Sequence, residues 1–305
     1  MAGASATMRH VQRVVVSVPA KVNLALRVGG PRADGFHPLD TVFEALDIFD
    51  DVEVRPAQEL TLSIKGLGED LPTDESNLAI RAARTLQERI GTHLGADIRI
   101  TKRIPVAGGM AGGSADAAGT LLALNELWEL GLSKDELMGI GAQLGSDVPF
   151  AFLGGLAHGV GRGEKLEPVR AGGMHAWVLL TRTEGLSTPA VFRQFDALFP
   201  DAGAPAGTQA LRRALGEASL AAVGDLLVND LQPAATSLRP EIGQEIERIA
   251  AAGHHVILSG SGPTIAVLIE PERAEELAAQ LRADFPYAVH VAYGPAAGAH
   301  VRQVQ

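Results

Sequence analysis

The feature that most constrains this chain is a glycine-rich segment that joins a predicted strand to a predicted helix. The strand pattern covers residues 96–102, the glycine-rich loop covers residues 105–113, and Ser114 opens an apolar pattern with helical spacing. Glycines at such a junction leave backbone N–H groups unobstructed, and the positive end of the helix dipole attracts anions. The segment therefore predicts an anion-binding turn in a fold that mixes strands with helices. A tight turn without a ligand is the alternative.

Two common nucleotide-binding motifs do not fit this segment. A Walker A loop requires Lys and then Ser or Thr after its last glycine, whereas Ser114 and Ala115 follow Gly113 here. No register of the segment matches G-x-G-x-x-G, the fingerprint of dinucleotide-binding folds. A bound phosphate group would therefore be held by backbone amides and by the helix N-terminus.

A lysine and an asparagine share one face of a predicted strand near the N-terminus. Apolar residues occupy every second position of residues 21–28, so Lys21 and Asn23 point to the opposite face. A turn-rich segment follows, and it contains Asp-Gly-Phe-His at residues 34–37. The two polar side chains aim a cation and an amide at one point, and the alternative is a solvated strand face.

A single carboxylate and a second glycine-rich turn complete the polar features. Asp147 lies between a small-residue turn and Val148-Pro149, where its alternative role is that of a cap or turn former. A carboxyl group is ionised at pH 7 and can accept a proton from a hydroxyl. Residues 259–264 (Ser-Gly-Ser-Gly-Pro-Thr) predict a hinge between two strands. Taken alone, each of these features has an ordinary structural explanation.

Taken together, the motifs resemble those of the GHMP kinases, a superfamily of small-molecule kinases. Residues 105–114 resemble its phosphate-binding motif, Pro-x-x-x-Gly-x-x-Gly-Gly-Ser, with Met110-Ala111 where Leu-Gly is usual. Residues 259–264 resemble its third motif, which packs against the phosphate loop. The resemblance implies that ATP is a substrate and that Mg²⁺ neutralises its charge. The residues that it implies for ATP binding are Pro105, Ala107, Gly108, Gly109, Met110, Ala111, Gly112, Gly113 and Ser114.

The opening motifs resemble one branch of this superfamily, the diphosphocytidyl-methylerythritol kinases. That branch has Lys-x-Asn-Leu, found here at residues 21–24, and Asp-Gly-(Tyr/Phe)-His, found here at residues 34–37. The resemblance implies that Lys21 and Asn23 flank the phosphoryl acceptor and that Phe36 and His37 bind its cytosine by stacking and by hydrogen bonding. The implied residues are Lys21 and Asp147 for catalysis and Asn23, Phe36, His37 and Thr188 for substrate binding.

The implied reaction is ATP-dependent phosphorylation of the 2-hydroxyl of 4-diphosphocytidyl-2-C-methyl-D-erythritol, with the 2-phosphate and ADP as products. It belongs to the non-mevalonate route to isoprenoids. Two alternatives stay open. Another GHMP kinase, acting on mevalonate, homoserine or a sugar, would keep the loop and Asp147 but would not require residues 34–37. A nucleotide-binding protein without kinase activity would not need both Lys21 and Asp147.

The order of predicted elements indicates an α+β protein whose two domains cover residues 1–165 and 166–305. The family resemblance implies a ribosomal-protein-S5-like N-terminal domain and a ferredoxin-like C-terminal domain, with ATP in the cleft between them. Further local predictions are strands over residues 41–48 and 51–55, a solvated turn at Asp50-Asp51, a mobile connection over residues 159–163 and a helix over residues 220–229.

Composition limits the partners of this chain. The net charge is −10 over 305 residues, so a broad surface for nucleic acid or for an anionic membrane is not expected. The absence of Cys excludes disulfides, thiolate catalysis and Cys-ligated zinc, and it favours a cytoplasmic enzyme. No stretch reaches the ~18 apolar residues of a membrane span, and residues 1–9 are expected to form a loose tail. The sequence does not choose between a monomer and a homodimer, and it does not identify Mg²⁺ ligands.

Overall fold

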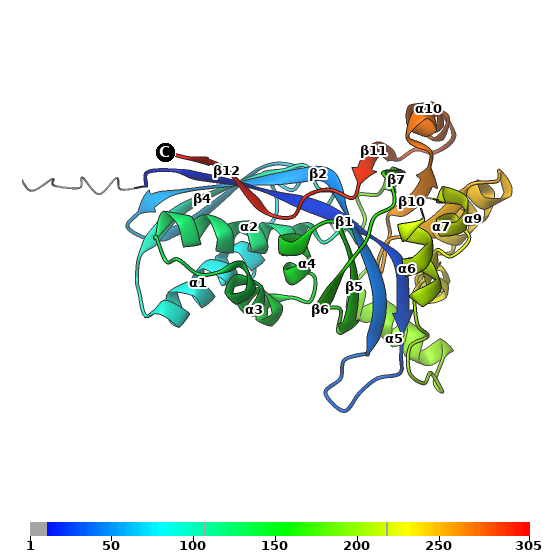
Figure 1. Cartoon of the computed structure of the whole chain (residues 1–305), viewed down its shortest axis with the longest axis horizontal. Coiled ribbons are helices and arrows are strands. Elements are labelled where there is room, and N and C mark those ends of the chain that lie inside the picture. The colour runs from blue at the N-terminus through cyan, green and yellow to red at the C-terminus, as the bar shows by residue number, and fades with distance from the viewer. Residues whose placement is uncertain (1–10, 107, 218) are drawn as a thin grey trace, which may run out of the picture.

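Two β-sheets and the helices packed on them form the described part of this chain (Figure 1). The computed structural model describes residues 11–106, 108–217 and 219–305, so the predicted N-terminal tail and Ala107 lie outside the described residues. The mixture of sheets and helices confirms the α+β prediction. Within these ranges, no helix is long and apolar enough to cross a membrane.

The larger sheet has eight strands among the described residues, in the order β12-β1-β2-β4-β3, with β5, β6 and β8 attached to this path. The strands are β1 (Val14–Val28), β2 (Leu39–Ala57), β3 (Leu60–Gly66), β4 (Gly95–Lys102), β5 (Leu156–Gly161), β6 (Lys165–Val169), β8 (Val228–Asn229) and β12 (His300–Val304). The two long strands β1 and β2 are paired almost end to end. The strands predicted over residues 41–48 and 51–55 are therefore one strand, with a register shift opposite the point where the predictions divide.

Four helices cover one face of this sheet: α1 (Leu78–Ile90), α2 (Gly112–Leu127), α3 (Lys134–Leu144) and α4 (Val148–Leu153) (Figure 1). Asn77 caps α1 by accepting a hydrogen bond from the backbone N–H of Ala79. Ser133 and Glu136 form a capping box at the start of α3. The inward side chains of α1 and α2 join those of β1, β2 and β4 in one hydrophobic core.

The smaller sheet has the strand order β11-β7-β10-β9. Its strands are β7 (His175–Thr181), β9 (His255–Leu258), β10 (Ile265–Ile269) and β11 (Ala288–Gly294). The helices of this half are α5 (Thr188–Leu198), α6 (Gln209–Gly216), α7 (Leu220–Gly224), α8 (Gln232–Leu238), α9 (Pro240–Ala251) and α10 (Ala274–Asp284), with the short helix η1 (Pro271–Arg273). Every residue of β7 is buried because its alternate side chains enter two cores. Trp177 and Leu179 join the core of the larger sheet, and Val178 joins the second core.

The second half of the chain supplies strands to both sheets. After the smaller sheet is complete, β12 returns to the larger one and pairs with β1, with Val14 opposite Val304. The short strand β8 pairs in parallel with the other end of β1, where Ala25 lies opposite Val228. The division into domains at residues 1–165 and 166–305 therefore stays a prediction, and the strand pairing crosses it.

The structure corrects two predictions about connections. Residues 159–163 were expected to be mobile, but most of them belong to β5, which is paired with β2 on one side and β6 on the other. The helix predicted over residues 220–229 ends at Gly224, and the backbone of Val228-Asn229 pairs with β1 instead. Backbone pairing with distant strands determines the structure of both segments, and local sequence patterns do not show such pairing.

Two predictions near the glycine-rich loop are also wrong in detail. Helix α2 begins at Gly112 rather than at Ser114, because Ala111 already has the left-handed conformation of the residue before the helix. Asp50 is fully buried within β2 and does not lie in a solvated turn.

Gly119 of α2 allows this helix to lie directly against the sheet. A Cβ atom at Gly119 would lie 2.7 Å from Val52 Cγ2 and 2.9 Å from Val18 Cγ1. Gly119→Ala should lower the free energy of unfolding by about 1 kcal/mol, because overpacking by about 1–3 kcal/mol exceeds a gain in helix propensity of about 1 kcal/mol. Chemical denaturation measures this change.

Gly139→Ala is the matched control. Gly139 lies in α3, and a Cβ atom there would meet nothing within 4 Å. Only the gain in helix propensity remains, so this variant should be more stable than the parent by about 0.5–1 kcal/mol. If both variants are stabilised equally, α2 does not pack on the sheet as closely as described.

Candidate active site

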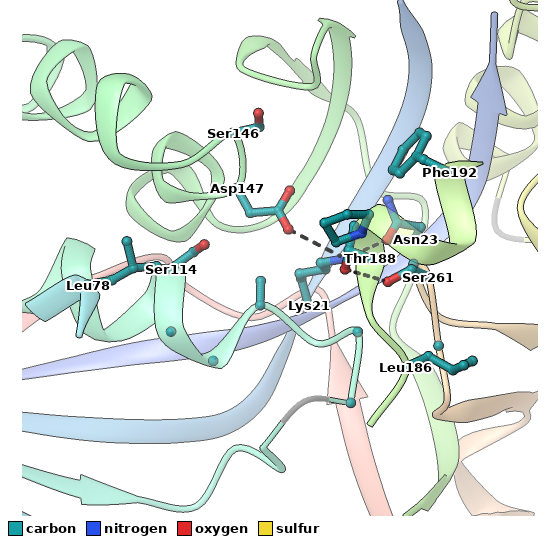
Figure 2. A pocket seen from close by; sticks show the side chains of 18 of the residues that line it. Lys21, Asn23, Leu78, Ser114, Ser146, Asp147, Leu186, Thr188, Phe192 and Ser261 are labelled. Atoms are coloured by element: carbon teal, nitrogen blue, oxygen red, sulfur yellow. Dashed lines mark hydrogen bonds and ion pairs between the residues drawn. The ribbon is translucent and has the colours of Figure 1, made fainter. Parts of the chain in front are cut away.

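A cavity of about 960 Å³ lies where β1, the loops around α2 and α4, the start of α5 and the hinge of residues 260–262 meet. Figure 2 shows Lys21, Asn23 and Asp147 projecting into it from the first half of the chain. Thr188 and Phe192 enter from the second half. The predicted residues that line it are Lys21, Asn23, Phe36, His37, Pro105, Gly108, Gly109, Ala111, Gly112, Gly113, Ser114, Asp147 and Thr188.

The glycine-rich loop is held against the hinge of the smaller sheet by a close backbone contact. Gly109 has a positive φ of 74°, and a Cβ atom on it would lie 2.2 Å from the carbonyl oxygen of Ser259. The hydroxyl of Ser259 donates to the carbonyl oxygen of Gly109 at 3.1 Å. Only glycine fits this position, so the predicted packing of residues 259–264 against the loop is present.

Met110 and Ala111, where the sequence departs from the usual family pattern, lie in different environments. Met110 does not line the cavity, because its side chain is 1% exposed and belongs to the core of the larger sheet. Its carbonyl oxygen accepts a hydrogen bond from the backbone N–H of Lys21. Ala111 has a positive φ of 59°, a conformation that costs a non-glycine residue about 1 kcal/mol. The loop therefore keeps its left-handed turn without the usual glycine.

Lys21 is buried beside Asp147 at the centre of the cavity (Figure 2). Its Nζ lies 3.7 Å from Asp147 Oδ2 and donates to Asn23 Oδ1 at 2.6 Å. The amide of Asn23 in turn donates to Thr41 Oγ1 at 2.9 Å. Burial lowers the pKa of Lys21 from 10.5, and the neighbouring Asp147 opposes this shift. The arrangement places a positioned cation beside a partly exposed carboxylate.

Aromatic and charged side chains gather at the other end of the cavity. Phe36 is 49% exposed, and the guanidinium of Arg162 lies over its ring at 4.8 Å. The His37 ring packs on Phe192 with 4.8 Å between the ring centroids. Its Nε2 lies 2.7 Å from Asp196 Oδ1. An exposed aromatic ring beside polar side chains is suited to binding a flat heterocycle.

Arg162, Phe192 and Asp196 line the cavity but were not among the predicted site residues. Arg162 lies within residues 159–163, which were predicted to be a mobile connection. Phe192 and Asp196 lie on α5, where Thr188 was the predicted contact. Their spacing of one helical turn was a signal that could have placed both on the face that Thr188 indicates. Thr188 itself shares a hydrogen bond of 2.8 Å with Ser261 of the hinge.

Comparison with known proteins identifies the family of this chain. The family model for the N-terminal domain of GHMP kinases matches residues 77–155, and the model for their C-terminal domain matches residues 211–286. A relative from Nocardioides sp. is 47% identical over 93% of this chain and 98% of its own length. This chain belongs to the GHMP kinase family. The family and the two-domain GHMP kinase fold predicted from the motifs are confirmed.

Other relatives of this GHMP kinase agree with the first. A relative from Rhodococcus jostii is 49% identical over 94% of each chain, and both relatives are named 4-diphosphocytidyl-2-C-methyl-D-erythritol kinase. A crystal structure of 4-(cytidine 5'-diphospho)-2C-methyl-D-erythritol kinase is 34% identical, with a TM-score of 0.73 over 92% of this chain and 99% of that one. The homoserine kinase of Cytophaga hutchinsonii, 20% identical with a TM-score of 0.71 over 97% of this chain and 98% of its own, shares the fold.

Next to the glycine-rich loop of this GHMP kinase, one lysine bridges two buried carboxyl groups. Lys102 Nζ lies 2.7 Å from Asp50 Oδ2 and 2.6 Å from Asp116 Oδ2. Asp50 also accepts hydrogen bonds from the backbone N–H groups of Arg103 and Ile104. The cluster thus ties both ends of the loop to β2. Asp116 Oδ1 has no hydrogen-bond partner among the described residues.

Burial raises the pKa of Asp116 from 3.8 to about 7; the Lys102 ammonium opposes the shift and Asp50 adds to it. Between about pH 4 and pH 7, the folded kinase therefore holds a proton that the unfolded chain releases. Stability that this proton provides is complete below the unfolded pKa and is lost as the pH rises through the folded one. Asp116→Asn should remove this loss, so its free energy of unfolding should fall less between pH 4 and pH 7 than that of the parent.

Denaturant unfolding at a series of pH values measures the difference. Asp70→Asn is the control, because Asp70 is exposed and has no hydrogen-bond or ion-pair partner in the described ranges. That variant should keep the pH dependence of the parent. An unchanged slope in Asp116→Asn would show that Asp116 is already ionised in the folded protein at low pH.

Proposed function

We propose that this kinase phosphorylates the 2-hydroxyl of 4-diphosphocytidyl-2-C-methyl-D-erythritol with ATP and releases the 2-phosphate and ADP. The names of its relatives support this reaction, which belongs to the non-mevalonate route to isoprenoids. The observation that carries the proposal is that one cavity holds the Lys21–Asp147 pair and also the aromatic end formed by Phe36, His37 and Phe192. The substrates of a mevalonate or homoserine kinase carry no nucleobase, so such a kinase would have none to bind at that end.

Kinases of this family use ATP, and the glycine-rich loop offers a site for its phosphates. The described loop residues 108–114 end at the N-terminus of α2, where free N–H groups and the helix dipole attract anions. Mg²⁺, when bound, would neutralise charge on the phosphate oxygens. The Ser114 hydroxyl, which lies beside the Gly145 turn that leads to Asp147, is the protein oxygen that would hold this ion. One such ligand fits Mg²⁺, because this ion takes few protein ligands besides phosphate oxygens and water.

Lys21 and Asp147 would act on the acceptor hydroxyl. Asp147 accepts the hydroxyl proton as the oxygen forms its bond to the γ-phosphorus and the bond to the β-phosphate oxygen breaks. The ammonium of Lys21, 3.7 Å from Asp147, stabilises the negative charge that develops on the oxygen. Asn23 holds Lys21 in place by accepting a hydrogen bond from its Nζ.

The far end of the cavity would hold the cytidine diphosphate. Phe36 and Phe192 both line it and offer ring faces to the cytosine, and His37 offers a hydrogen bond. Arg162 and Arg193 line the same cavity, and neither has an ion-pair partner among the described residues. A diphosphate needs such cations in a chain whose net charge is −10. A cytoplasmic location and the choice between monomer and homodimer stay predictions.

The test is ADP release by the purified kinase with Mg-ATP and 4-diphosphocytidyl-2-C-methyl-D-erythritol, beside mevalonate, homoserine and galactose. Turnover is expected with the cytidylyl substrate alone. Turnover with another acceptor would keep the kinase mechanism and discard the substrate. If ATP binds but no acceptor yields ADP, the protein is a nucleotide-binding protein without kinase activity.

Asp147→Asn should lower kcat by about 100-fold or more, because an amide cannot accept the proton and general-base assistance contributes about 10²–10⁴ in rate. The Kd for ATP should change far less, since the loop that holds the phosphates is untouched. Steady-state kinetics and calorimetry measure the two quantities. A variant with near-normal kcat would remove Asp147 from the role of base.

A further inference from the structure

The contact between His37 and Asp196 joins the two halves of the chain at the base-binding end of the cavity. His37 lies in the loop between β1 and β2, and Asp196 lies on α5. Their side chains meet at 2.7 Å between Nε2 and Oδ1, and the His37 side chain is 8% exposed. Both residues line the cavity. The pair is therefore both a contact between segments and part of the site.

The carboxylate determines which ring nitrogen of His37 carries a proton. An ionised carboxyl group only accepts hydrogen bonds, so Nε2 must donate to Asp196. In a neutral imidazole with its proton on Nε2, the other nitrogen, Nδ1, is an acceptor. Nδ1 makes no hydrogen bond within the part of the chain that the structure describes, and it is not fully buried. It remains available to a ligand.

Packing fixes the orientation of the same ring. The imidazole lies against Phe192 at 4.8 Å, with 34° between the ring planes. Phe195 meets it edge-on at 6.1 Å. The ring is thus held on α5 by two aromatic side chains while Asp196, on the same helix, anchors Nε2. A ring rotation that brought Nε2 to the ligand would break the contact with the carboxylate.

We propose that Asp196 is a positioning residue that makes this kinase select cytosine over uracil, by holding His37 with its Nδ1 as a hydrogen-bond acceptor. The inference rests on the proposed function and adds the means of base selection. Cytosine carries an amino group at position 4, which donates, whereas uracil carries a carbonyl oxygen there, which accepts. An acceptor Nδ1 forms a hydrogen bond with the amino group of cytosine and repels the carbonyl oxygen of uracil. A site built on such a hydrogen bond discriminates strongly, because the wrong ligand leaves its polar groups unpaired.

The test compares kcat/KM for the cytidine-linked substrate with kcat/KM for its uridine-linked analogue. In Asp196→Asn, the amide can donate to Nε2, which moves the proton of His37 to Nδ1 and makes that nitrogen a donor. The preference for cytidine should fall by about 10-fold or more, through a higher KM for the cytidine substrate and a lower one for the uridine analogue. Asp196→Ala should give a smaller loss, since neither tautomer is then imposed. The KM for ATP should not change.

The pair of Asp40 and His158 provides the matched control. Its Nε2–Oδ1 distance is 3.1 Å, and Asp40 also accepts a hydrogen bond from Thr208, so it too links distant segments. Neither residue lines the cavity. Asp40→Asn tests the loss of a structural carboxylate–histidine contact. It should leave the ratio of kcat/KM for the cytidine-linked substrate to kcat/KM for the uridine-linked analogue unchanged. Thermal unfolding of each variant shows whether it is folded at the assay temperature.

Two outcomes would overturn the inference. If Asp196→Asn slows both substrates by the same factor, Asp196 serves only to dock α5 on the loop. If it changes neither, His37 does not read the base through Nδ1. Calorimetric binding of CDP and UDP gives the same comparison without catalysis, and it applies even if a variant is slow. Failure of the proposed function has a different signature: the parent kinase would not phosphorylate the cytidylyl substrate at all.

Discussion

The site depends on one backbone contact, the approach of Gly109 in the glycine-rich loop to Ser259 in the hinge of the smaller sheet. No side chain fits between them, because a Cβ atom on Gly109 would lie 2.2 Å from the Ser259 carbonyl oxygen. Asn229 also holds the hinge, since its amide donates to the carbonyl oxygens of Leu258 and Gly260. Through this contact, a loop of the larger sheet and a turn of the smaller one form a single wall of the cavity. Lys21 of β1 and Thr188 of α5 then line the same cavity.

The parts of the site that the sequence predicted are those whose chemistry is local. A run of glycines before a helix indicates exposed backbone amides wherever the chain places it, and residues 108, 109 and 111–114 do line the cavity. Lys21 and Asn23 share a strand face by the period of two, and the structure joins them by a hydrogen bond. The capping box of Ser133 and Glu136 is a local feature of the same kind, because Ser followed three residues later by Glu is typical of a helix start. The family resemblance added the long-range assembly, which local patterns do not contain.

The parts that the sequence did not predict depend on contacts between distant segments. Asp50 resembles a solvated turn residue, yet it is buried because Lys102 and two backbone N–H groups satisfy its oxygens. Nothing near Asp196 in the sequence indicates that His37 will lie against it, since 159 positions separate the two residues. Residues 159–163 have a loop-like composition, but residues 159–161 form the end of β5, which is paired on both sides. In each case the structure of the residue or segment is set by a contact with a partner that lies far away along the chain.

The return of β12 to the larger sheet has a consequence for how the protein is made. During synthesis β1 is made before the other described strands. The strand that covers its edge from Val14 to Ser17, β12, is made only after the smaller sheet. Until then, β1 presents unpaired backbone groups that can pair with another chain. The growing polypeptide must therefore keep this edge from aggregating for most of its synthesis, which makes the larger sheet, although first in sequence, the last to be completed.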